Sequence, residues 1–506
     1  MKVMRAVNTK QCAPIIYALL QLIIFYAGLN AVKGVWPLPH ALTSSVEQYP
    51  LNPQTFAFDY GKHSATQQGC SLLDAAFRRY FSLIFPDYTA GRWTEEFLKS
   101  SKIYCSVGFP DNLSVSAGQA SLNAATVWGI LRGLETFSQL VYQDDLGSYF
   151  VNETFIEDFP RFQFRGVLLD TSRHYLPVHA ILKTLDAMSY SKFNVFHWHI
   201  VDDPSFPYQS RSFPELSKKG AFHPATHVYT QSDVRRVISY ARMRGIRVLP
   251  EFDSPGHTGS WGKGQSDLLT PCYKGGAPSG TFVTSVFPDS YIHLGGDEVD
   301  FSCWRSNPHV RAFMQKMGFG GDFPKLEAFY IENIVNITSA NNKTSIVWQD
   351  VFDYHERVGA HQDFTVLVEV WKHGCYLCKV RQVTKAGLRV ILASPWYLDL
   401  PGPTHNWARY YTVWPLAFPG SEKQKRLVIG GEVCMWGEYV DATNLFPKLW
   451  PRASAAAERL WSDEKQTSSV EKAFPRLEDF RCKLLRRGIQ AGPLNVGHCK
   501  HEYQGV

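Results

Sequence analysis

Two adjacent acids, Asp297 and Glu298, close the short segment 293–299, which reads HLGGDEV. In an extended segment neighbouring side chains point to opposite sides, so the two carboxyls would face different parts of one site. Hydrolysis of a glycosidic bond ordinarily uses two carboxyls, about 5 Å apart for retention and about 6.5–9.5 Å apart for inversion. Adjacent acids do not obviously flank a sugar ring in this way. The second reacting group would then come from another strand or from the substrate itself.

Acids, histidines and aromatic residues also follow other short apolar runs of the chain. They are Arg173, His174, His197, His199, Asp202, Asp203, Glu251, Asp253, His257, Trp348, Glu369, Trp371, Trp396, Tyr397, Trp436 and Glu438. Sugar rings offer apolar C–H faces to aromatic rings, and their hydroxyls hydrogen-bond charged groups. A site of this composition therefore suits a sugar.

A metal site is the alternative for part of this set. His197 and His199, with Asp202 or Asp203, have the spacing of ligands at the end of a strand. Histidines in such positions also serve as hydrogen-bond partners. We favour hydrogen bonding and expect neither a metal nor a cofactor.

The residues that could do chemistry must be held by the apolar runs that precede them. Eight such runs alternate with helix-like segments, at residues 166–170, 193–199, 246–251, 291–294, 345–348, 366–370, 389–392 and 427–429. Continuous Val/Ile/Leu runs are typical of strands buried on both faces, and their alternation with helices indicates parallel strands. Eight units predict a (β/α)8 barrel, whose chemistry lies at the carboxyl ends of its strands. The polar residues above stand at those ends.

The chain divides into three parts on this basis. Residues 1–35 predict a signal peptide or an uncleaved anchor, since Lys2, Arg5 and Lys10 precede an apolar run. Residues 36–158 predict a small α+β domain with helices near 71–85 and 120–141, and residues 159–506 predict the catalytic barrel. The formal charge of +6 is small for 506 residues and shows no basic stripe, so no nucleic-acid partner is expected.

Ten cysteines and the Asn-x-Ser/Thr motifs at Asn112, Asn152, Asn336 and Asn342 fit the secretory pathway. Three disulfides between neighbours along the chain are candidates, although sequence does not fix the connectivity: Cys70 with Cys105, Cys272 with Cys303, and Cys482 with Cys499. Cys375 and Cys378 would form a local disulfide or remain two thiols.

The motifs together resemble glycoside hydrolase family 20, the β-N-acetylhexosaminidases, and in particular the vertebrate lysosomal α and β subunits. They are RGVLLDTSRHY (165–175), FHWHIVDD (196–203), EFDSPGHT (251–258), HLGGDEV (293–299) and GEVCMWGE (431–438). The resemblance covers nearly the whole chain after residue 35.

The resemblance implies substrate-assisted, retaining removal of terminal β-linked N-acetylglucosamine or N-acetylgalactosamine from glycans and glycolipids. Glu298 would be the general acid, and Asp297 would orient the 2-acetamido group that attacks the anomeric carbon. Substrate-binding roles would fall to Arg173, Trp348, Trp371, Tyr397, Asp399, Trp436 and Glu438. Supporting roles would fall to Asp202, His257, Asp253 and His199.

The resemblance further implies a lysosomal or secreted protein, a homo- or heterodimer with a related subunit, and a lipid-presenting activator protein for gangliosides. Asp399-Leu400 resembles the β-subunit pattern, which is tied to neutral substrates, whereas the segment at Gly280 resembles the α subunit. The subunit identity is therefore mixed.

One segment departs from the family pattern. Between the third and fourth predicted strands only residues 281–290 remain for a crossover that normally takes a dozen or more residues. We expect the barrel to lack part of this crossover, as a skipped exon or a gene-model error would cause. A catalytically silent glycan-binding or assembly subunit is therefore an alternative, and a two-carboxylate retaining glycosidase using Glu298 and Glu438 is a third.

Overall fold

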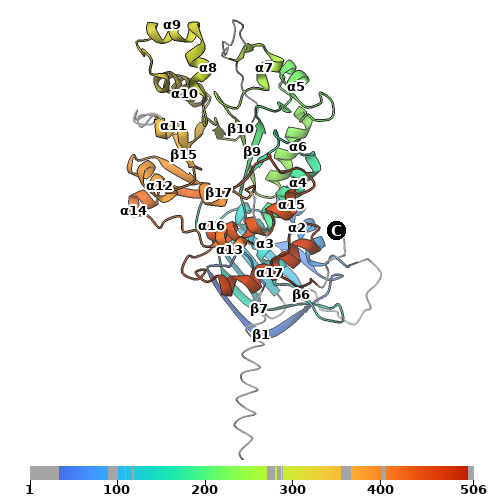
Figure 1. The fold of residues 1–506 in the computed structure, drawn as a ribbon. Helices are drawn as coiled ribbons and strands as arrows, with labels where there is room; N and C mark the ends of the chain where they lie inside the picture. The colour runs from blue at the N-terminus through green and yellow to red at the C-terminus, as the bar shows by residue number, and fades with distance from the viewer. Residues whose placement is uncertain are drawn as a thin grey trace, which may run out of the picture. The chain divides into compact units, whose positions relative to one another are not determined.

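The computed structural model describes residues 34–88, 101–108, 110–116, 119–269, 280–281, 287, 289–354, 366–400 and 406–499. It divides into two compact units, residues 1–159 with 471–480 and residues 160–470 with 481–506 (Figure 1). Residues 1–33 of the expected targeting segment lie outside the described residues. Within the described ranges, no helix combines the length and apolarity that a membrane span requires.

The first unit is built on a seven-stranded mixed sheet, coloured blue to cyan in Figure 1. Its strands lie in the order β1 (Ala41–Leu51), β7 (Tyr149–Glu157), β4 (Asn112–Ser116), β5 (Gln119–Ala124), β3 (Lys102–Val107) and β2 (Ala57–Tyr60), with β6 (Tyr142–Gln143) paired to β7. Two helices of the described chain belong wholly to it, α2 (Ser71–Ile84) and α3 (Val127–Leu140). The predicted α+β character is confirmed.

One helix of this unit begins later than predicted. The sequence indicated a helix from about residue 120, but β5 occupies residues 119–124 with side chains that alternate between exposed or half-buried and buried positions. Helix α3 starts after Thr126, whose side chain accepts a hydrogen bond from the Gly129 N–H. Buried side chains alternate with a period of two in this segment, as in a strand. The helical spacing of apolar residues begins only after it.

The second unit contains a closed barrel of eight parallel strands, as predicted. In barrel order they are β8 (Phe164–Asp170), β9 (Val195–Val201), β10 (Arg247–Phe252), β13 (Tyr291–His293), β14 (Thr344–Trp348), β15 (Val366–Val370), β16 (Arg389–Leu392) and β17 (Val428–Met435). Every residue of β8, β9 and β15 is buried, because both faces of these strands are covered.

Helices connect and surround these strands. They are α4 (Val178–Tyr190), α5 (Pro214–Gly220), α6 (Gln231–Arg242), α7 (Trp261–Gly264), α8 (Phe301–Ser306), α9 (Pro308–Lys316), α10 (Phe323–Ala340), α11 (Gln349–Tyr354), α12 (Tyr376–Lys385), η2 (Ser394–Trp396), α13 (Trp407–Tyr411), α14 (Glu422–Lys425), α15 (Leu445–Leu449) and α16 (Arg452–Trp461). The last helix, α17 (Val470–Arg486), is divided between the units, because residues 471–480 belong to the first. Capping helps to place them: the Thr230 and Asp233 side chains each cap the other's backbone N–H at the start of α6.

The connection between β10 and β13, residues 253–290, is the one expected to lack part of its crossover. Its described part holds only the four-residue helix α7 and the small strand pair β11 (Asp267–Leu268) and β12 (Gly280–Thr281). Strand β13 is the shortest of the barrel, and Tyr291 and Ile292 are only half-buried. The barrel nevertheless closes, with β13 paired to both neighbours. Although part of this connection lies outside the described residues, β13 completes the closed barrel.

Side chains fill the barrel in three layers of different character. The layer at the amino ends of the strands is apolar: Phe164, Val195, Leu249, Ile346, Leu367 and Ile391. The next layer is ionisable and fully buried: His197, Glu251, His293, Glu369 and Glu432. The layer at the carboxyl ends is formed by Leu168, Trp348, Ala393, Tyr397 and Cys434. Bulky branched residues dominate most such barrels, so the polar middle layer requires an explanation.

The cysteine predictions are only partly confirmed. Cys482–Cys499 forms as predicted, Cys375–Cys378 forms a local disulfide, and Cys303 is disulfide-bonded, while Cys272 lies outside the described residues. Cys70 and Cys105 are free thiols, so the pairing predicted for them is wrong in this structure. Proximity along the chain does not supply the close, oriented approach of two Cβ atoms that a disulfide requires.

Among the glycosylation motifs, Asn336 and Asn342 are exposed, whereas Asn152 is buried. The Asn152 side chain is held by Tyr142 and Ser45, so this motif does not offer a free acceptor.

Candidate active site

A pair of glycines brings Asp297 and Glu298 into the barrel mouth. Gly295 (φ +70°) and Gly296 (φ +93°) both have left-handed backbones, which side chains disfavour. A Cβ on Gly295 would lie 1.6 Å from Asp253 Oδ1, and the Gly296 N–H donates to the same oxygen at 3.0 Å. The loop after β13 is thus hydrogen-bonded to Asp253 at the end of β10. Glycine is required in this turn, because a side chain would clash with Asp253.

Two non-glycine residues of the site also have left-handed backbones, His257 (φ 53°) and Glu298 (φ 50°). Non-glycine residues adopt this conformation at a cost of about 1–3 kcal/mol, and such residues cluster at functional sites. Their loops touch, because a Cβ on Gly256 would lie 2.6 Å from the Asp297 carbonyl oxygen. As a result His257 Nε2 lies 3.6 Å from both Asp297 Oδ2 and Glu298 Oε2.

The two acids have different surroundings. The Asp297 side chain is 11% exposed and that of Glu298 is 59% exposed. Burial raises the pKa of Asp297, the imidazole of His257 opposes this effect, and the pKa stands at about 6. Asp297 Oδ1 has no hydrogen-bond partner. A buried acceptor without a partner is available to a donor on a substrate.

Behind His257 stands a group of ion pairs. Asp202 Oδ1 lies 3.4 Å from His257 Nδ1, and Arg173 lies 3.0 Å from Asp202 Oδ2. Burial lowers the pKa of His257, but its hydrogen bond to Asp202 and the charge of Asp297 outweigh this effect and raise the pKa to about 9. His257 therefore carries a positive charge at neutral pH, facing both acids.

Four aromatic rings form a cage beside the acids. The ring centre of Trp348 lies 6.5 Å from that of Trp371 and 5.9 Å from that of Trp436. The ring centre of Tyr397 lies 6.3 Å from those of Trp371 and Trp436. Trp348 and Tyr397 are buried, whereas Trp371 and Trp436 are half-buried. The rings come from the ends of β14, β15, β16 and β17, so only the closed barrel assembles them.

Charged groups that can hold hydroxyls stand beside the cage. Arg173 pairs with Asp170 at 2.9 Å and with Glu438 at 3.2 Å, and its guanidinium lies over the Trp436 ring. Burial raises the pKa of Asp399 to about 6, with the charge of Glu438 adding to the effect. Asp399 Oδ1 and the Trp436 indole N–H have no hydrogen-bond partners.

The residues considered for a metal lie in hydrogen-bonded pairs with carboxylates. His199 Nε2 lies 2.8 Å from Asp202 Oδ2 and its Nδ1 lies 2.5 Å from Glu251 Oε2. His197 Nδ1 lies 2.7 Å from Glu432 Oε1. Proton-sharing contacts of this length suit imidazolium–carboxylate pairs. Several His/carboxylate groups in the described chain have potential ligand atoms within 4.8 Å of one another, among them Asp253, His257 and Asp297.

Three acids of the site were given no individual role from the sequence, although Glu251 was among the residues expected at the strand ends. Asp170 accepts the N–H groups of Ser172, Arg173 and Gly437. Asp350 accepts the Trp371 indole N–H at 2.8 Å, and Glu251 accepts that of Trp348 at 2.7 Å. Both Asp170 and Glu251 stand at or next to the ends of predicted strands, so the strand-end rule, which found Glu251, could also have found Asp170. Asp350 stands in α11 and had no such signal.

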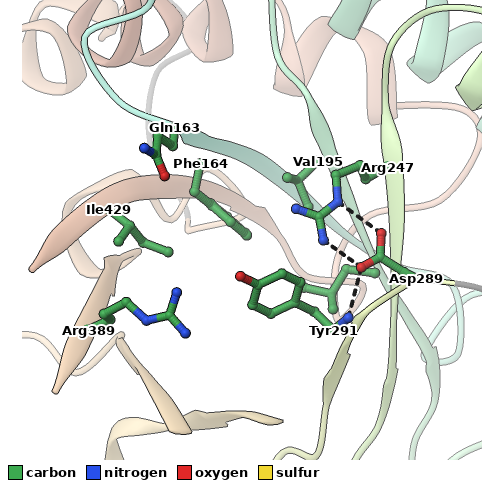
Figure 2. Close-up of a pocket in the computed structure, with 9 residues that line it drawn as sticks. Gln163, Phe164, Val195, Arg247, Asp289, Tyr291, Arg389 and Ile429 are labelled. Atoms are coloured by element: carbon green, nitrogen blue, oxygen red, sulfur yellow. Dashed lines mark hydrogen bonds and ion pairs between the residues drawn. The ribbon is translucent and has the colours of Figure 1, made fainter. Parts of the chain in front are cut away.

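A separate recess lies at the opposite end of the barrel, where β8, β9, β10, β13 and β16 begin (Figure 2). It encloses about 480 Å³, including the part open to solvent. Arg247 forms a two-pronged ion pair with Asp289, which also accepts the Tyr291 N–H. The described lining contains no acid–imidazole pair, and barrel enzymes place their chemistry at the other end.

Paired acids, a cationic imidazole and an aromatic cage at the carboxyl ends of a (β/α)8 barrel define a carbohydrate hydrolase. The chain belongs to glycosyl hydrolase family 20, since that family's catalytic-domain model matches residues 162–279 and 281–464. A second model, described as beta-acetyl hexosaminidase like, matches residues 112–140. The predicted family is confirmed, and the chain is an exo-acting glycoside hydrolase of the β-N-acetylhexosaminidase type.

Two curated relatives are similar along almost their whole length. The Bos taurus beta-hexosaminidase subunit alpha is 51% identical, over 96% of this chain and 98% of its own. The Homo sapiens beta-hexosaminidase subunit beta is 50% identical, over 93% of this chain and 90% of its own. These nearly equal identities favour neither subunit type.

Solved structures show the same architecture. The chitobiase of Flavobacterium johnsoniae superposes with a TM-score of 0.77 at 25% identity, over 91% of this chain and 74% of that one. The alignment with the bovine subunit spans 525 positions, more than the 506 residues here, so that relative has residues with no counterpart in this chain.

Proposed function

We propose that Glu298 and Asp297 divide the chemistry of this hydrolase. The acetamido oxygen of the substrate attacks the anomeric carbon while the bond to the leaving oxygen breaks and Glu298 gives its proton to that oxygen. Asp297 accepts the acetamido N–H and stabilises the positive oxazolinium ring. Water then attacks the anomeric carbon, Glu298 takes its proton, and the acetamido group is restored with retention.

The aromatic cage is the observation that carries this proposal. Trp348, Trp371, Tyr397 and Trp436 offer an apolar space for an acetamido methyl group, and the unpartnered Asp297 Oδ1 is a buried acceptor for the adjacent N–H. A site built to hydrogen-bond a donor rejects an analogue that lacks it, because the buried acceptor is then left unpaired. The pocket therefore supports selection of N-acetylated sugars.

The groups around the cage support a terminal sugar ring. We assign Arg173, Glu438 and Asp399 to its hydroxyls, since they supply a donor fork and two acceptors beside the Trp436 ring. Asp202, His257, Asp253 and His199 support the acids from behind. Glu438 is paired with Arg173, which favours a binding role over the nucleophile role of the two-carboxylate alternative.

Subunit association and glycan substrates follow from the similarity to the two subunit types. We propose a homo- or heterodimer, terminal β-linked N-acetylglucosamine or N-acetylgalactosamine on glycans and glycolipids as substrates, and a lipid-presenting activator protein for gangliosides. We further propose that residues 1–35 direct the chain into the secretory pathway and to the lysosome, and that residues 36–158 and 159–506 are its two domains.

A reporter assay tests the activity directly. The purified full chain is incubated with 4-nitrophenyl glycosides of N-acetyl-β-glucosamine and N-acetyl-β-galactosamine, and released nitrophenol is measured. Turnover of both is expected. A correctly folded chain without turnover would instead be a silent subunit, an alternative that no feature of the described site favours.

A further inference from the structure

A continuous file of alternating carboxylates and imidazoles runs from the middle of the barrel to the catalytic acids. Glu432 Oε1 lies 2.7 Å from His197 Nδ1, and His197 Nε2 lies 3.2 Å from Glu251 Oε2. That oxygen lies 2.5 Å from His199 Nδ1, and His199 Nε2 lies 2.8 Å from Asp202 Oδ2. We call Glu432, His197, Glu251, His199 and Asp202 the buried relay; all are at most 1% exposed.

His199 is the positive member at the centre of the relay. Both of its ring nitrogens lie at hydrogen-bonding distance from a carboxylate oxygen, so each needs a proton to donate. Burial lowers the pKa of His199, but the charge of Glu251 and the hydrogen bond to Asp202 outweigh it and raise the pKa to about 10. Burial raises the pKa of Glu251, yet His199 and His293 hold it well below its usual range. The pair is therefore imidazolium and carboxylate.

The relay ends on Asp202, which faces the chemistry. His199 and Arg173 hold its Oδ2, and the Asp203 N–H donates to its Oδ1 at 2.6 Å. That same Oδ1 faces His257 Nδ1 at 3.4 Å, and His257 in turn faces Asp297 and Glu298. These contacts favour the ionised form of Asp202 and hold its carboxylate in one orientation.

Glu251 also reaches the wall of the sugar pocket. Its Oε1 accepts the Trp348 indole N–H at 2.7 Å and lies 3.1 Å from His293 Nδ1, while its Oε2 serves the two histidines of β9. One carboxylate therefore joins the aromatic cage to the residues behind the acid. Gly166 leaves room for the far end of the relay, because a Cβ there would lie 2.3 Å from Glu432 Oε2.

We propose that Glu251 and His199 are positioning residues for the proton-transfer step. They keep Asp202 anionic and aimed at His257, which holds the acids in place. This inference rests on the proposed role of Glu298 as the general acid. It accounts for a polar layer in a barrel that would otherwise gain more from apolar packing.

The test separates proton transfer from mere packing. Protonation of the leaving oxygen matters for a poor leaving group and little for a good one. The full chain and its variants Glu251→Gln and His199→Gln are assayed at one pH on phenyl and 2,4-dinitrophenyl N-acetyl-β-glucosaminides. The quantity compared is kcat/KM, which reports the steps up to departure of the leaving group. Glu458→Gln is the matched control, because Glu458 is equally buried but pairs with Tyr411 on α13.

We expect kcat/KM of both relay variants to fall on the order of 10-fold on the phenyl substrate and less than about 2-fold on the dinitrophenyl substrate. The ~10-fold loss is a part of the ~10²–10⁴-fold acceleration that a general acid supplies. The control should change the two values equally. Equal losses on both substrates, or no loss, would overturn the inference. The ratio of the two values is independent of the folded fraction, so it can be read even from a destabilised variant. A wild-type chain without turnover would refute the proposed function instead.

Discussion

The exchange Glu298→Gln tests the division of work between the two acids most directly. Gln keeps the size and shape of the side chain and removes the proton that the leaving oxygen would receive. The Glu298 side chain is 59% exposed, and its Oε2 lies 3.6 Å from His257 Nε2. Substitutions at exposed positions of this kind change the free energy of unfolding by less than about 0.5 kcal/mol. Any large loss of activity would therefore come from chemistry and not from unfolding.

The size of the kinetic loss follows from the role. A general acid contributes ~10²–10⁴-fold, which corresponds to about 3–5 kcal/mol of transition-state stabilisation. We expect kcat/KM on the phenyl N-acetyl-β-glucosaminide to fall by this amount and that on the dinitrophenyl substrate to fall far less. Asp203→Asn is the matched control, since Asp203 is 58% exposed and lies 3.9 Å from His257. A Glu298→Gln variant within about threefold of wild type on the phenyl substrate would refute the assignment.

Three further expectations follow from the same geometry. Removing the acetamido group from the substrate should lower kcat/KM at least about 10³-fold, because the substrate then lacks its nucleophile. Equal kcat/KM for 4-nitrophenyl β-glucoside and its N-acetylamino counterpart would exclude substrate assistance. Gly295→Ala should lower the free energy of unfolding by several kcal/mol, since the new Cβ would lie 1.6 Å from Asp253 Oδ1 on a left-handed backbone; a loss below about 1 kcal/mol in urea unfolding would show that the loop adjusts. The raised pKa values of His199 (about 10) and His257 (about 9) stabilise the fold fully below pH ~6.5, and this stabilisation should be lost as pH rises through 9 to 10. Urea unfolding at pH 7 and pH 10 measures the loss, which should be smaller in His257→Gln, and an equal loss in that variant would contradict the pairing.

Much of the barrel could be predicted from the sequence. Buried parallel strands are continuous apolar runs, and all eight predicted runs overlap strands of the closed barrel, although β17 continues to Met435, well beyond the predicted run 427–429. The strand-end rule then located the acids, the histidines and the aromatic rings. The start of helix α3 was harder to predict, because the apolar residues of 119–124 are compatible with both a strand and a helix.

Side chains of different strands contact each other when they lie at the same height in the barrel. The spacing of residues along the sequence does not reveal that height. Glu251 and Glu432 lie in strands far apart in sequence, yet His197 contacts both. The sequence pattern marked His197 and His199 as metal ligands or hydrogen-bond partners without distinguishing the two. In the structure, ring nitrogens of both histidines lie 2.5–2.8 Å from carboxylate oxygens, which is the length of charge-assisted hydrogen bonds.

The sequence by itself determined the fold class, the family and the identity of the acidic pair, because each depends on local pattern: apolar runs, glycine turns and motifs of a few residues. Only the tertiary structure decided that the barrel closes through the short strand β13, and that Glu298 is exposed while Asp297 is buried. It alone placed the buried relay behind them. The physical reason is that burial and charge pairing are properties of side chains brought together from different strands, and no single segment contains them.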